Sequence, residues 1–224
     1  MKINPFNLKK AELQTYLTGY CKHRNPYQHH PNCFRNEILN GEKGIKQGIL
    51  DIEFMGGFRA NYGVILTYAI KEFGKNNYYT GKLNTDDVHK YIFDKNLVSS
   101  LIDDINKFDE IITFYGTRCD IPYIRTRSLK YGLPFPFYGF VKHKDLYYLA
   151  KYKLSLSSNS LETVCQLLGV KGKNHMNPDL LLKGFLGDNK SLDEIMEHNL
   201  RDVRITEKAY KRLINYSRKT NRSI

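Results

Sequence analysis

The stretch GILDIEFMGG, residues 48–57, places two carboxylates, Asp51 and Glu53, inside an otherwise apolar run. Side chains on a strand alternate between its two faces, so Asp51 and Glu53 point to one side and Ile52 to the other. Two adjacent like charges raise each other's pKa and destabilise the fold unless a cation lies between them. The stretch is therefore either an edge strand with a solvated face or a strand that helps to bind a divalent cation.

The segments around this stretch predict a mixed α/β sheet. Together with 48–54, residues 60–73 and 77–83 are rich in β-branched and aromatic residues and predict three successive antiparallel strands joined by Gly- and Asn-containing turns. Further along, residues 110–116 predict a short buried strand. Because strands then alternate with helices, we expect parallel strands to extend the sheet.

Helical patterns occupy most of the remaining chain. They cover residues 97–108, 120–132 and 160–170, and a last helix is predicted from about 191 to 216. The apolar stripe expected on that last helix comprises Leu192, Ile195, Met196, Leu200 and Val203. The fold class that follows is an α/β sheet flanked by helices.

Charge is distributed unevenly along the 224 residues, whose net charge is +12. Residues 1–46 hold eight Lys/Arg against three Glu, residues 203–224 hold seven against one, and the middle is nearly neutral. Basic ends on a neutral domain favour a nucleic-acid partner, although a solvated surface would give the same pattern. We expect a basic Cys/His-rich segment (1–45), one main domain (46–217) and a basic tail (218–224).

Membrane insertion and secretion are not expected. No apolar run approaches the roughly 18 residues that span a bilayer, and the stretch MKINPFNLKK lacks a signal-peptide core. We expect a soluble, cytoplasmic protein with no membrane contact. Four cysteines in a chain of this length do not suggest a disulfide framework, which leaves reactive or metal-bound thiols. Cys119 and Cys165 read as small buried residues.

Two further acidic residues are candidates for the same site as Asp51 and Glu53. Asp120 follows the strand at 110–116, and Asp202 comes four residues after His198, so that these two share one helix face. If the first strand is central, four carboxylates meet in one cleft and need a metal. Taken singly, Asp120 could be only a helix cap and His198 only a surface residue.

These motifs resemble those of the DEDD group of 3′–5′ exonucleases in the ribonuclease-H-like superfamily. LDIEF matches the Asp-x-Glu strand motif, IITFYGTRCDIPYI the strand, turn and helix with Asp120, and HNLRDV the helical motif with His198 and Asp202. The resemblance implies a ribonuclease-H-like sheet over about 47–215. By the spacing of its third motif the chain is similar to the proofreading domain of family-B DNA polymerases and to stand-alone predicted nucleases of that branch.

The sequence departs from the family pattern at three positions. Tyr115 stands in a turn where Asn is common, Cys119 replaces an aromatic residue, and His198 has the spacing usual for Tyr. A ribonuclease-H-type endonuclease is a rival within the superfamily. That arrangement normally takes its Glu from a helix, whereas Glu53 follows Asp51 on one strand, so the exonuclease interpretation is preferred.

Phosphodiester hydrolysis needs an activated water and neutralisation of charge on the phosphate and on the departing oxygen. Two Mg²⁺ or Mn²⁺ ions about 3.5–4 Å apart provide both, and carboxylates are the ligands that these ions prefer. We expect Asp51 to bridge both ions, Glu53 and Asp202 to position an ion and the water, and Asp120 to bind the second ion. His198 would orient or deprotonate the water.

The N-terminal stretch CKHRNPYQHHPNCF concentrates two cysteines and three histidines within residues 21–34. Cys21, His23, His30 and Cys33 could bind one Zn²⁺ tetrahedrally, with His29 as a competitor for the place of His30. The alternative is a polar loop with incidental histidines.

The function expected from the sequence is a metal-dependent 3′–5′ exonuclease, a hydrolase that acts on single-stranded DNA or RNA. The choice between the two nucleic acids depends on contacts to the 2′-hydroxyl that the sequence does not place. The alternative function is a catalytically inactive nucleic-acid-binding or accessory protein of the same fold.

Overall fold

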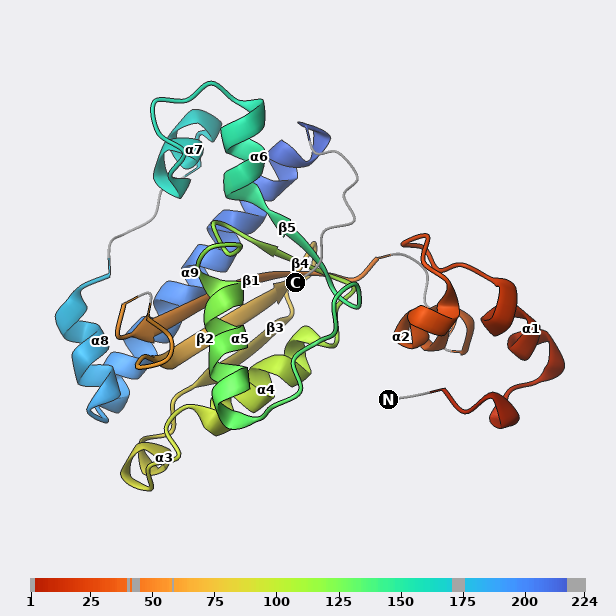
Figure 1. Ribbon diagram of the computed structural model, residues 1–224. Helices are drawn as coiled ribbons and strands as arrows, with labels where there is room; N and C mark the ends of the chain where they lie inside the picture. The colour runs from red at the N-terminus through yellow and green to blue at the C-terminus, as the bar shows by residue number, and fades with distance from the viewer. Residues whose placement is uncertain (1–2, 40, 42–44, 58, 171–175, 217–224) are drawn as a thin grey trace.

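The computed structural model describes residues 3–39, 41, 45–57, 59–170 and 176–216 (Figure 1). Its centre is a five-stranded sheet in the order β3-β2-β1-β4-β5. The pairs β1–β2 and β2–β3 are antiparallel, whereas β1–β4 and β4–β5 are parallel. The predicted mixed sheet is confirmed, and β1 is its central strand. The strand bounds are β1 Gln47–Met55, β2 Val64–Glu72, β3 Tyr78–Lys82, β4 Glu110–Thr113 and β5 Lys142–Asp145.

Strand alternation divides β1 between two hydrophobic cores. Leu50 and Ile52 belong to a core that also contains residues of α4 (Lys95–Ile105) and α5 (Asp120–Tyr131). Ile49 faces the opposite side and joins a core with residues of α6 (Leu146–Lys153) and α9 (Asn189–Leu213). Figure 1 shows α4 and α5 on one face of the sheet and α9 on the other. Asp51 and Glu53 therefore project toward α9, in register with Ile49.

Helix α9 is the longest element and begins with a side-chain cap. Asp188 accepts hydrogen bonds from the backbone N–H groups of Lys190 and Ser191, which places the start two residues before the predicted one. Leu192, Ile195 and Val203 of the predicted stripe are buried, but Met196 and Leu200 are only half-buried. Polar residues occupy the same buried face where α9 crosses β1 and β2, namely Asn199, Asp202 and Thr206.

A buried ion pair fixes α5 against the start of α4. Arg127 and Asp94 both have fully buried side chains, and Arg127 Nε donates to Asp94 Oδ2 at 2.9 Å. Arg127 Nη1 also donates to the carbonyl oxygen of Ala60 at 3.0 Å, and Asp94 accepts from the backbone N–H of Ile65 at 2.8 Å. This network joins α4, α5 and the β1–β2 loop, and it thereby positions Asp120 at the start of α5.

Several short elements differ from the sequence prediction. The fourth predicted strand is followed by β5, whose residues KHKD lack the apolar pattern of a buried strand because it forms an edge of the sheet. Helix α8 (Pro178–Phe185) was also not predicted; it has Pro at its first position and a side-chain cap from Asn177. The smaller helices are α3 Thr85–His89 and α7 Leu161–Leu168, and η4 Ile214–Tyr216 ends the described chain.

The N-terminal segment forms a small helical unit at the side of the sheet (Figure 1). Lys22 Nζ pairs with Asp109 Oδ2 at 2.6 Å, and Lys142 Nζ donates to the carbonyl oxygen of His23 at 3.3 Å, so this unit contacts the sheet domain directly. Its elements are η1 Pro5–Asn7, α1 Lys10–Thr18, η2 Tyr27–His29, α2 Pro31–Phe34 and η3 Arg35–Leu39. The predicted basic tail, 218–224, lies outside the described residues.

Among the described helices, not one combines the length and the apolar character needed to cross a membrane.

Candidate active site

Glu53, His198 and Asp202 lie together where β1 meets α9. Each offers a ligand atom, and these atoms lie within 4.8 Å of one another. His198 Nδ1 is 3.1 Å from Glu53 Oε1 and 3.6 Å from Asp202 Oδ2. An ionised carboxylate only accepts hydrogen bonds, so a proton on Nδ1 of His198 would be donated to Glu53 and would leave Nε2 with the lone pair of a neutral ring.

Asp51 contacts the same turn of α9 through a different residue. Asn199 Nδ2 donates to Asp51 Oδ2 at 2.6 Å, and Asn199 Oδ1 accepts from the hydroxyl of Thr67 on β2. The Asn199 side chain is fully buried. The amide therefore links β1 and β2 to α9 and fixes the direction of the Asp51 carboxylate.

Asp120 approaches β1 from the side of β4, beyond the point where the pairing of these two strands ends. It is the first residue of α5 and is buried, and its Oδ1 accepts from the backbone N–H of Ile52 at 3.2 Å. Parallel pairing of β1 with β4 ends at Ile49, so the carboxylate takes the place that a strand partner would have at Ile52. Because Ile52 lies between Asp51 and Glu53, this contact brings Asp120 to the border of the same site.

An open groove of about 500 Å³ adjoins His198 on the outer side of α9. Its wall carries both basic and acidic side chains, among them Lys190, Arg201, Glu194 and Glu197, and Met176 and Leu180 supply apolar surface. The groove has room for a group the size of a nucleotide next to His198.

The two cysteines of the sheet domain lie near the acidic residues. Burial raises the pKa of the Cys165 thiol, and the negative charge of Asp202 raises it further. Cys165 is therefore protonated at neutral pH and belongs to a small apolar cluster between α7 and α9. Cys119 is half-buried and immediately precedes α5.

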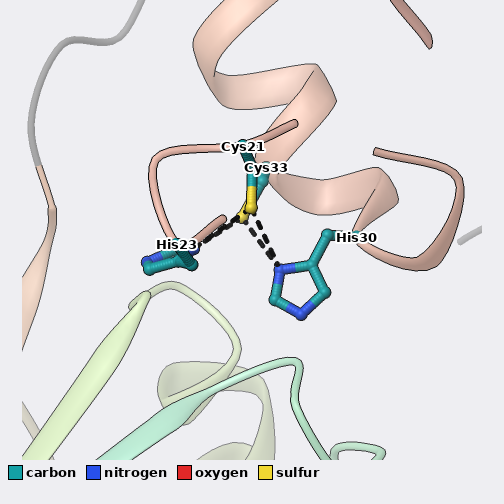
Figure 2. Close-up of side chains that lie close together, drawn as sticks. All are labelled: Cys21, His23, His30 and Cys33. Carbon is teal, nitrogen blue, oxygen red and sulfur yellow. Dashed lines mark hydrogen bonds between the residues drawn. The ribbon is translucent and has the colours of Figure 1, made fainter. Parts of the chain in front are cut away.

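The four N-terminal Cys and His residues form a second group, away from the acidic residues in sequence and structure. Cys21, His23, His30 and Cys33 are all buried and offer ligand atoms within 4.8 Å of one another (Figure 2). His29 is exposed, so His30 and not its neighbour joins the group.

Sequence reasoning missed Asn199 and Thr67 as partners of the acidic residues. The signal for Asn199 was available, because it follows Ile195 by four residues and precedes Val203 by four, which puts a polar side chain in the middle of the apolar stripe. Thr67 carried no comparable signal, since Thr is common in strands.

Comparisons with known proteins bear on the fold and the family. A comparison with curated proteins found no match. Among solved structures, the fold is similar to that of the family B DNA polymerase from the hyperthermophilic archaeon Pyrobaculum calidifontis, with a TM-score of 0.58 and 17% identity. The match covers 77% of this chain and 25% of the polymerase, so the chain corresponds to about a quarter of that protein.

The family is shown by a separate match. The model of the RNase H superfamily matches residues 49–214, which include most of β1, all of α5 and α9, and all five predicted catalytic residues. The chain belongs to the RNase H superfamily.

Proposed function

We propose that this protein is a metal-dependent nuclease that hydrolyses phosphodiester bonds of single-stranded DNA or RNA from the 3′ end. The observation that carries the proposal is the meeting of Glu53, His198 and Asp202 within 4.8 Å, bordered by Asp51 and Asp120. Membership of the RNase H superfamily and the similarity in fold to a DNA polymerase support a nucleic-acid substrate.

The residues fit divalent cations such as Mg²⁺ or Mn²⁺. Carboxylate oxygens dominate the donor set, and these hard ligands suit such ions. Asp202 is only 1% exposed and lies one helical turn from His198, so a cation would also compensate the negative charge buried there. When bound, two such ions would neutralise the charge of the phosphodiester and of the departing oxygen.

Each residue has a distinct role in the proposal. Asp51 would hold both ions, Asp120 would hold the second, and Glu53 and Asp202 would hold an ion and orient the water. Glu53 Oε1, 3.1 Å from His198 Nδ1, would hold a proton on that atom and leave Nε2 to accept a proton from the attacking water. His198 thus serves as the general base at the spacing where related enzymes have Tyr.

The 3′ polarity rests on the order and spacing of the three motifs, and the basic chain ends support contact with phosphates. The groove next to His198 is the place proposed for the terminal nucleotide, where Arg201 and Lys190 can contact its phosphate.

The test uses 5′-labelled single-stranded DNA and RNA with Mg²⁺ or Mn²⁺. We expect a ladder that shortens from the 3′ end and that disappears with EDTA and with Asp202→Asn. Asp103→Asn is the matched control, because Asp103 is an exposed carboxylate on α4, on the opposite face of the sheet from α9. Substrate that is bound but never shortened with either metal would favour the non-catalytic nucleic-acid-binding alternative.

A further inference from the structure

Local backbone structure brings the four N-terminal ligand residues together in two pairs. Cys21 and His23 lie in a tight turn in which Cys21 N–H donates to the carbonyl of Asn25 at 2.9 Å. His30 is the residue just before α2 and Cys33 lies within that helix, so three residues separate the members of the second pair. Figure 2 shows the two imidazoles on either side of the two sulfur atoms, each with a ring nitrogen toward them.

The distances within this group match those of a tetrahedral zinc site. Zn–S bonds of about 2.3 Å and Zn–N bonds of about 2.0–2.1 Å, at the tetrahedral angle, place N and S about 3.6 Å apart. The Nδ1 atoms of His23 and His30 lie 3.7 and 3.7 Å from Cys21 Sγ. The same atoms lie 3.2 and 3.4 Å from Cys33 Sγ. All four N–S distances thus agree with the expected value to within about 0.4 Å.

The chemistry of the donors selects zinc. Both cysteines are thiols, and two thiolates with two imidazoles in a tetrahedral arrangement are typical of Zn²⁺. His30 Nε2 lies 3.2 Å from the side-chain amide of Asn25. With Nδ1 on the metal, Nε2 carries a proton, and the amide oxygen of Asn25 can accept it in the flipped orientation, which would fix the ring.

The described part of the N-terminal segment has only a small apolar core. Its apolar cluster contains four buried residues, Cys21, Tyr27, Cys33 and Phe34, and two of these are the cysteines themselves. None of the residues of α1, all of which the structure describes, is buried. A unit of about 40 residues with so small a core usually needs a metal or disulfides to fold.

We propose that Cys21, His23, His30 and Cys33 bind one structural Zn²⁺ and that this ion folds residues 3–39 into a module distinct from the sheet domain. The four positions for protein ligands are filled, so the site is structural and not catalytic. The contacts of Lys22 with Asp109 and of Lys142 with the carbonyl of His23 attach the module to the sheet domain. The ion thereby fixes a basic segment at the side of the nuclease.

The direct test is the metal content and Co²⁺ spectrum of the full chain, with excess Mg²⁺ present to fill the acidic site. We expect one zinc per chain. After replacement by Co²⁺ we expect tetrahedral d–d bands together with thiolate-to-cobalt charge-transfer absorption. A site of carboxylates and one histidine cannot give the charge-transfer absorption, because it has no thiolate. A wild-type chain that lacks the charge-transfer absorption would overturn the proposal even if no variant folds.

Single substitutions test which side chains are the zinc ligands. His30→Ala and Cys33→Ser should lower the zinc content from one per chain to none, whereas His29→Ala, which alters the exposed neighbour, should keep it. Retention of one tightly bound zinc by Cys33→Ser would refute the ligand set.

Proteolysis tests the coupling of the metal to folding. Removal of zinc by a chelator should make residues 3–39 sensitive to protease, while the sheet domain stays resistant. Equal resistance of both parts after zinc removal would contradict the folding role. Neither readout involves nucleic acid, so the zinc proposal and the nuclease proposal stand or fall separately.

Discussion

Replacement of Asn199 by Leu tests whether the buried amide prepares Asp51 for metal binding. Asn199 Nδ2 donates to Asp51 Oδ2 at 2.6 Å, and a hydrogen bond to a charged acceptor contributes about 1.5–3 kcal/mol. At about 1.36 kcal/mol per tenfold change in rate, its loss corresponds to a roughly 10- to 150-fold reduction in kcat/KM if the whole effect falls on the reaction. Leu has the same number and branching of side-chain heavy atoms as Asn, so it leaves no cavity at this fully buried position, although its methyl groups are larger than the amide atoms.

The assay is a Mg²⁺ titration of nuclease activity at fixed oligonucleotide concentration, with the Tm measured beside it. We expect Asn199→Leu to require more Mg²⁺ for half-maximal activity and to remain folded. Thr67→Val is the matched control, because it removes the hydroxyl that donates to Asn199 Oδ1 and leaves the bond to Asp51. Its effect should be smaller than that of Asn199→Leu. A folded Asn199→Leu protein with unchanged kcat/KM and Mg²⁺ dependence would refute the positioning role.

Three more predictions concern catalysis and stability. His198→Gln should lower kcat by about 10²–10⁴ at neutral pH; an unchanged kcat would exclude His198 as the base. Asp94→Ala should lower the free energy of unfolding, measured in urea, by about 3–5 kcal/mol, because it leaves the buried Arg127 guanidinium without its counter-ion; a loss below about 1 kcal/mol would show that the pair is unimportant. Burial lowers the pKa of His143 to about 4 from its ordinary 6.5, so the unfolded chain takes up a proton first as the pH falls. Stability should therefore drop between pH 6.5 and 4, by up to about 3 kcal/mol from this residue, and His143→Gln should remove that part of the slope in urea unfolding at several pH values.

The sequence predicted those parts of the fold that follow from local periodicity. The alternation of Leu50, Asp51, Ile52 and Glu53 predicted which side chains share a face, but it left open whether the strand lies at an edge or at the centre of the sheet, where the structure has it. Strand β5 was not predicted, because its stability comes from pairing with β4 at an edge and not from its own residues KHKD. Tertiary pairing of this kind leaves no local signal.

The candidate site was predictable as a set of residue types but not as a set of contacts. The motifs named Asp120, but they did not show that its carboxylate accepts from the backbone of Ile52 in place of a strand partner. They also missed that Asn199 reaches Asp51, because this contact depends on how α9 crosses the sheet. In the N-terminal segment the spacing left His29 and His30 open, and only the start of α2 decides which imidazole faces the sulfur atoms.

The polarity of cleavage tests the central claim most directly. The same single-stranded oligonucleotide is labelled at its 5′ or its 3′ end and digested with Mn²⁺, alongside a circular single strand without ends. The account predicts that the 3′ label is released at once as a mononucleotide, that the 5′ label moves down a ladder one nucleotide at a time, and that the circle stays intact. Cleavage of the circle would contradict the exonuclease account and identify an endonuclease on the same fold.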